Sequence, residues 1–193
     1  MKRILLLSVL AVIQFLPVTA QFLGDGSMGN PYRGTLAGAF TISGTKYFTG
    51  TIIIDNEQLT IAPGTILIAA TGTSGILVNG TGQLNAQGTS ASRILITSDS
   101  DLDGTYGEPT DTWGNITLIS SGVSNISYCT IENGRRLATR IGYYGGGLYL
   151  GTSSVTVTST TIRNCIAGYG GAIIVAGTTS PVISGCIITG NSA

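Results

Sequence analysis

The residues best suited to bind an ion are five acids within one short stretch of the chain. They are Asp99, Asp101, Asp103, Glu108 and Asp111. Three aspartates at alternate positions followed by Gly104 match the first half of a calcium loop, in which positions 1, 3 and 5 supply oxygen ligands. Position 12 of that loop, which should be a bidentate Glu, is Thr110. We therefore expect these five acids to bind calcium weakly, and the alternative is a solvated acidic loop.

Aromatic and basic side chains are candidates for a ligand-binding face. Tyr144 and Tyr169 hold equivalent positions in two matching segments, so their rings are expected to be neighbours. Such rings can carry sugar rings, or they can pack one repeat against the next. Arg135, Arg136 and Arg140 form a small basic loop that would attract an anionic glycan or simply be exposed. The candidate ligand face therefore includes both tyrosines and the first two arginines.

Side chains suited to catalysis are scarce. A polysaccharide lyase needs a base and a cation near the sugar carboxylate, and Asp99–Asp103 with Arg135 or Arg136 would supply them. The chain contains no His, which is the commonest general acid or base. No pair of acids recurs on neighbouring repeats, as hydrolysis by two carboxylates requires. We expect a non-catalytic protein, and the alternative is a carbohydrate-active protein that binds or cleaves polysaccharides.

Internal repeats predict the elements that hold these residues. Tyr144–Leu150 matches Tyr169–Val175, and Leu59–Ile68 resembles Leu84–Ile96 with Ile66 opposite Ile94. A period of roughly 20–30 residues, made of short β-rich runs and glycine turns, indicates a solenoid. Stacking its coils about 4.8 Å apart would line up like residues and seal the interior. The predicted fold is all-β, a right-handed parallel β-helix of about six coils.

A third repeat family predicts which residues stack in the core and at a corner. It consists of Ile126–Asn133, Val157–Asn164 and Ile183–Ile188, whose spacing also suits a solenoid. Ile131, Ile162 and Ile188 should form one buried aliphatic ladder. Asn133 and Asn164 should occupy the left-handed region at a corner, because Asn tolerates that conformation better than most residues.

Residues 1–20 have the pattern of a cleavable signal peptide. Lys2 and Arg3 supply the positive start, Ile4–Leu16 is almost wholly apolar, and small residues precede a cleavage site before Gln21. The apolar run is shorter than the ~20 residues that a membrane-spanning helix needs. The protein is therefore expected to be exported, extracellular or on the outer surface of the cell, with no membrane-spanning segment after cleavage.

Composition and charge limit the partners and the domains. Without residues 1–20 the chain has seven Lys/Arg and nine Asp/Glu, so its formal net charge is 7 − 9 = −2. This argues against nucleic acid, which calls for a basic face. Residues 21–50 lack the repeat and are expected to cap the first coil, with β-helix repeats over 51–193. Because no polar cap follows Asn191–Ala193, we expect the natural chain to continue.

The three cysteines are not expected to form disulfides. Cys129 and Cys186 share a register two coils apart, with Thr160 between them. Two coil spacings are roughly 9.6 Å, and a disulfide cannot join Cα atoms more than about 7 Å apart. Together with Cys165 they should be three buried, reduced thiols.

Part of the chain resembles a known family. Thr161–Ala167 followed by Gly170–Ile173 resembles the paired F-x-x-N and G-G-A-I repeats of polymorphic outer-membrane proteins, although Ile162 does not take the phenylalanine position. Leu59–Thr65 and Thr112–Ile116 resemble β-helix repeat proteins of bacterial surfaces. Together these resemblances span about residues 50–191. They imply a secreted or surface-displayed scaffold similar to adhesins, with an extracellular glycan or protein as its partner.

Overall fold

The computed structural model describes residues 21–136, 144–152 and 154–193, and every regular element in them is a β-strand. The expected signal peptide, residues 1–20, lies outside the described residues. All pairings between the named strands are parallel. The part of the chain that the structure describes has no helix long and apolar enough to cross a membrane.

The larger sheet contains 11 strands and curls back on itself. Its strands are β1 (Tyr32–Thr35), β3 (Thr45–Asp55), β5 (Ile66–Ala69), β6 (Gly75–Asn79), β8 (Ile94–Ser98), β9 (Ile116–Leu118), β11 (Cys129–Glu132), β13 (Leu148–Leu150), β15 (Thr161–Arg163), β17 (Ile173–Val175) and β19 (Ile187–Thr189). Their spatial order is β17-β13-β9-β6-β3-β5-β8-β11-β15-β19, with β1 beside β3. The first residues of β3 pair with β5 and its last residues pair with β6, so β3 joins the two halves of the sheet.

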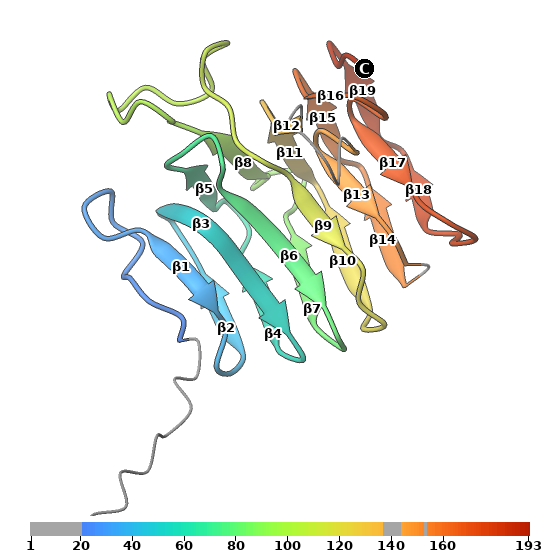
Figure 1. Ribbon diagram of the computed structural model, residues 1–193, viewed down its shortest axis with the longest axis horizontal. Helices are drawn as coiled ribbons and strands as arrows, with labels where there is room; N and C mark the ends of the chain where they lie inside the picture. Colours follow the sequence, from blue (N-terminus) through green and yellow to red (C-terminus); the bar gives the residue numbers. More distant parts are fainter. Residues whose placement is uncertain (1–20, 137–143, 153) are drawn as a thin grey trace, which may run out of the picture.

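A second sheet has six strands, and a small third sheet has two. The second contains β2 (Phe40–Ile42), β4 (Gln58–Ile61), β7 (Gln83–Gln87), β10 (Ser124–Ser127), β14 (Val155–Thr158) and β18 (Val182–Ser184), and the third contains β12 (Arg135–Arg136) and β16 (Ile166–Ala167). Figure 1 shows the earliest strands at one end of the molecule and the latest at the other. This stacking of parallel strands is consistent with a parallel β-helix or solenoid.

The core contains ladders of aliphatic side chains in register. Ile131 pairs with Ile162, and Ile162 pairs with Ile188, as the repeats predict. Ile131 and Ile162 are fully buried, whereas Ile188 is 53% exposed. The expected burial of Ile188 is therefore wrong, because β19 is the last strand on its side of the sheet.

The predicted repeat alignments are confirmed with one small difference. Tyr144 bridges to Tyr169 in parallel, and β13 pairs with β17 in the expected register. Leu59 pairs with Leu84 as expected, but Ile66 pairs with Leu95 and not with Ile94. The pairing of β5 with β8 is thus shifted by one residue from the expected alignment, and the shift arises in the segment between β7 and β8.

Left-handed backbone recurs at one corner. Asn133 and Asn164 have φ values of 61° and 55°, and Gly190 at the next equivalent position has 64°. The neighbouring strand pairs place these three residues one after another along the stack. The left-handed conformation expected for the two asparagines is confirmed.

Parallel pairing begins before residue 51, within the segment expected to be a cap. β1 pairs with β3, and β2 pairs with β4. Three aromatic rings pack together at this end, with centroid separations of 5.3 Å for Phe22 and Tyr32, 4.9 Å for Phe22 and Phe40, and 5.4 Å for Tyr32 and Phe40. Residues 21–50 thus combine paired strands with an aromatic cover.

All three cysteines are free thiols. The pairing of Thr130 with Thr161 and of Thr161 with Ile187 confirms the shared register of Cys129 and Cys186. Burial raises the pKa of Cys129 to about 12 and that of Cys165 to about 11. Cys186 is only partly buried, which corrects the expectation of three buried thiols, since it lies in the last repeat.

Candidate functional site

The acidic segment forms the long loop between β8 and β9. Asp99 N donates a hydrogen bond to Ala69 O at 3.0 Å, which attaches the start of the loop to β5. Asp111 closes the loop, because its Oδ1 accepts from Ser100 N at 2.8 Å and its Oδ2 from Glu108 N at 3.3 Å. Asp111 therefore uses both carboxylate oxygens to hold the loop together.

Three of the five acids converge. One carboxylate oxygen from each of Asp99, Asp101 and Asp103 lies within 4.8 Å of the other two. Asp99 is fully buried, while Asp101 and Asp103 are exposed. The Tyr47 hydroxyl donates to Asp99 Oδ2 at 3.3 Å, whereas the buried Oδ1 has no hydrogen-bond partner among the described residues. The arrangement leaves one shielded carboxylate oxygen without a donor.

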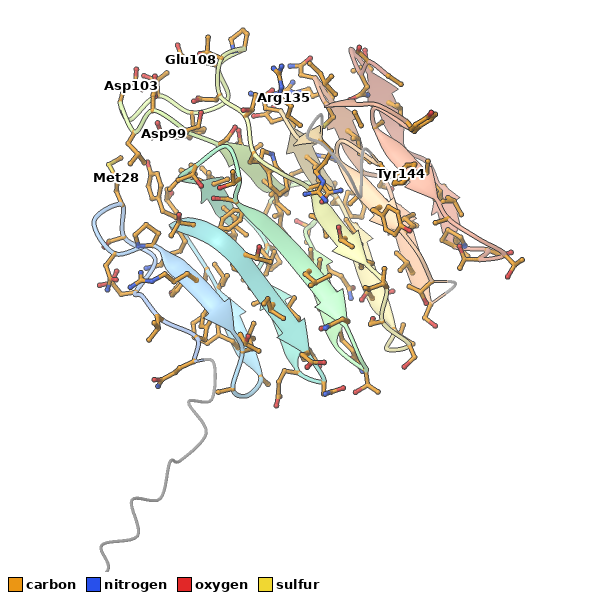
Figure 2. All side chains as sticks on the ribbon, in the orientation of Figure 1. Met28, Asp99, Asp103, Glu108, Arg135 and Tyr144 are labelled. Carbon is orange, nitrogen blue, oxygen red and sulfur yellow. The ribbon has the colours of Figure 1, made fainter. Side chains whose placement is uncertain are left out.

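Glu108 adds negative charge beside the three aspartates. Its pKa is raised, first by the charge of Asp103 and then by burial and the charges of Asp111, Asp101 and Asp99. Figure 2 shows Asp99, Asp103 and Glu108 on the same loop, with Arg135 and Tyr144 apart from them. Asp99, Asp103 and Glu108 therefore lie apart from Arg135 and Tyr144.

The two register-matched tyrosines contact each other on the surface. The ring centroids of Tyr144 and Tyr169 are 5.5 Å apart and tilted by 33°, and Tyr144 lies 6.3 Å from Tyr149. Tyr144 is 40% exposed and Tyr169 is 61% exposed. The rings pack against one another and still present area to a ligand.

The expected basic loop is instead a short strand whose two arginines line different grooves. Arg135 and Arg136 form β12 and pair with Ile166 and Ala167 of β16. Arg135 lines a groove of about 320 Å³ together with Asp111. Arg136 lines a second groove of about 230 Å³. The third arginine of the expected loop, in residues 137–143, lies outside the described residues.

The groove beside Arg136 contains polar residues that sequence reasoning missed. Its wall includes Thr51, Ser74, Asn115 and Thr117. Among the described residues nothing accepts a hydrogen bond from the buried Nε of Arg136. The Arg136 side chain therefore brings a positive charge to a groove lined by hydroxyl and amide groups, while its Nε is buried.

Asn115 links this groove to the tyrosines. Its Nδ2 donates to Gly145 O at 2.7 Å and to Tyr144 O at 3.2 Å, so it holds the backbone that carries Tyr144. Its Oδ1 accepts from Thr117 Oγ1 at 3.1 Å. Thr117 in turn pairs with Tyr149 on the next strand. The polar groove and the aromatic rings thus form one continuous face. We call it the β9/β13 face, and it consists of Arg136, Asn115, Thr117, Tyr144, Tyr149 and Tyr169.

Glu132 is a buried acid with a structural role. Arg163 contacts Glu132 Oε2 through Nη2 at 2.6 Å and through Nε at 2.7 Å. Thr97 Oγ1 donates to Glu132 Oε1 at 2.9 Å. Strands β8, β11 and β15 each supply one of these residues, so the network ties three neighbouring strands together.

Comparisons with protein families, with curated proteins and with solved structures found no match for this chain. The resemblance to polymorphic outer-membrane proteins therefore stays an expectation. The candidate functional features of the described residues are the β9/β13 face and the acidic loop.

Proposed function

We propose that this protein is an exported, non-catalytic scaffold that binds an acidic glycan outside the cell through the β9/β13 face. The observation that carries the proposal is the groove in which Arg136 lies beside hydroxyl and amide side chains and which adjoins the exposed tyrosine rings. Export rests on the sequence pattern of residues 1–20. The bound glycan would serve in adhesion to a surface.

The scaffold is proposed to be a right-handed parallel β-helix of about six coils. Parallel register over successive repeats supports this winding, and crossovers between parallel strands are right-handed in about 98% of known cases. Such a rod repeats its surface every coil, so one long face can follow an extended polymer.

The β9/β13 face offers the groups that an acidic sugar needs. A planar guanidinium such as that of Arg136 matches a carboxylate in two parallel hydrogen bonds. Threonine hydroxyls and the Asn115 amide suit sugar hydroxyl groups. Tyr144 and Tyr169 supply flat apolar rings against which a pyranose ring can pack. A charged sugar therefore fits this face better than a neutral one.

Direct binding tests the proposal. The purified protein is titrated against immobilised polyuronate, sulfated and neutral glycans, and we expect binding to the acidic glycans only. Arg136→Gln should weaken binding by about tenfold or more, since a hydrogen bond to a charged group contributes about 1.5–3 kcal/mol. A Tyr144→Ala/Tyr169→Ala double variant should weaken it about two- to tenfold.

Matched controls separate this face from general effects of charge and aromatic area. Arg33→Gln removes an exposed arginine near the other end of the chain, and Tyr106→Ala removes an exposed tyrosine from the acidic loop. Both should bind like the parent protein. Equal losses in the control variants, or no binding to any acidic glycan, would refute the proposal.

The alternative function is cleavage of an acidic polysaccharide. Asp111 and Arg135 line the same groove, which brings together an acid and a cation as a lyase requires. Both Asp111 oxygens, however, already accept hydrogen bonds within the loop, so this carboxylate is a poor base. Release of unsaturated uronate from pectin or alginate, abolished by Arg135→Ala, would favour the lyase over the non-catalytic scaffold.

A further inference from the structure

The buried carboxylate oxygen of Asp99 needs a partner. Isolated burial of a charged oxygen is costly, and native proteins almost always supply a hydrogen bond or a cation. The other oxygen accepts one long hydrogen bond from Tyr47, and among the described residues Oδ1 has no donor. One carboxylate oxygen of Asp99 lies within 4.8 Å of an oxygen of Asp101 and of Asp103, so the neighbouring groups add negative charge to this carboxylate instead of a donor. A bound cation would satisfy this oxygen.

The separation of the three oxygens is compatible with calcium. Ca–O distances are about 2.4 Å, so two oxygens on opposite sides of a calcium ion are about 4.8 Å apart. The three aspartate oxygens lie within that separation of one another. Magnesium requires oxygens about 2.1 Å away in a nearly octahedral arrangement, and it retains water more strongly. Calcium accepts more varied coordination than magnesium, so a loop with two exposed carboxylates suits the larger ion.

We propose that Asp99, Asp101 and Asp103 bind one calcium ion, which Asp99 anchors from the buried side of the loop. Glu108 lies close enough to these aspartates to interact electrostatically with them, and it adds to the negative potential at the site. Water completes the coordination on the exposed side. Three protein carboxylates with two of them exposed place the Kd on the order of 10⁻⁴–10⁻³ M, the range of extracellular calcium modules.

The ion would fasten the loop to the body of the scaffold. Asp99 follows β8 directly and its Oδ2 accepts from Tyr47 on β3, so the ligand cluster contacts two strands of the larger sheet. Calcium bound to Asp101 and Asp103 would hold the outer part of the loop against this point. The site is independent of the β9/β13 face, so failure of one proposal leaves the other intact.

A calcium titration of the EDTA-treated full protein tests the proposal. We expect about 10 mM CaCl₂ to raise Tm by about 3–6 °C, because binding at tenfold Kd stabilises only the folded state. The same concentration of MgCl₂, at matched ionic strength, should raise Tm by less than half as much. Isothermal titration with CaCl₂ should give one site per chain.

Three variants make the result specific. An Asp101→Asn/Asp103→Asn double variant changes only exposed side chains and should fold but lose the calcium response. Asp99→Asn should unfold at the same or a higher temperature than the parent in EDTA, because it removes a buried charge, and should also lose the response. Asp55→Asn removes an exposed acid from the same strand as Tyr47 and should respond like the parent.

The proposal is overturned if calcium leaves Tm unchanged, if magnesium matches calcium, or if the double variant responds like the parent.

Discussion

Ile162 and Ile188 have the same place in the repeat but very different surroundings, and this contrast gives a quantitative test of the fold. Ile162 is fully buried between its partners on β11 and β19, whereas Ile188 is 53% exposed on the last strand. Ile162→Ala removes buried carbon atoms and leaves a cavity, so it should lower the free energy of unfolding by about 2–5 kcal/mol. Ile188→Ala removes carbon atoms that are already partly in water and leaves no closed cavity, so the free energy of unfolding should fall by only about 1 kcal/mol.

Urea unfolding measures both losses. Far-UV circular dichroism reports all strands, and the fluorescence of Trp113, the single and fully buried tryptophan, reports the centre of the molecule. Two probes are needed because a repeat protein can lose an end before its centre unfolds. Ile119→Ala serves as the control, since Ile119 is 49% exposed and lies outside this ladder. If Ile188→Ala costs as much as Ile162→Ala, Ile188 is covered in the native molecule and the reasoning is wrong.

Two further predictions concern the titration of Cys129 and the ion pair between Glu132 and Arg163. The folded pKa of Cys129, about 12, lies above the ordinary value of 9, so between these pH values the unfolded chain loses a proton that the folded chain keeps. The free energy of unfolding should therefore fall as pH rises above 9, and it should fall less steeply in Cys129→Ala. Tm measured from pH 7 to 11 checks this. In the native state a thiol reagent should modify Cys186 before the two buried cysteines. Arg163→Met leaves the buried Glu132 carboxylate with the hydrogen bond from Thr97 alone and should lower the free energy of unfolding by about 1–3 kcal/mol. We expect a value at the lower end of this range, because Arg163 is half exposed. Glu132→Gln combined with Arg163→Met should cost less than the sum of the single variants in urea unfolding, and strict additivity would show that the pair does not interact.

Sequence reasoning succeeded where the repeat itself determines the contact. The stacking of Ile131 on Ile162 and of Tyr144 on Tyr169 follows directly from the period, because like positions in successive repeats become neighbours in parallel strands. The burial of Ile188 could not be read in this way. Burial depends on what covers a strand, and the period is the same for a central strand and for the last one.

The candidate sites were predictable only where their residues are close in the chain. Asp101 and Asp103 converge with Asp99 because each of the three residues is only two positions from the next in the chain, at the start of one loop. The contact of Asn115 with the backbone of Tyr144 was not predicted, because Asn115 belongs to none of the internal repeat alignments. A two-residue strand such as β12 is also too short to show the alternation of apolar and polar residues by which a strand is predicted.

The long loop that carries the acids has almost no influence on the register of the strands around it. The chain between Asn85 and its partner Asn125 includes this loop and is much longer than the chain between Leu59 and Leu84, yet both pairs are aligned in the same sheet. Chain entropy explains the tolerance, since closing a loop of twice the length costs only about 0.6 kcal/mol more. New loops can therefore be grafted at this edge, to carry a chosen surface, while the stacked strands stay as they are.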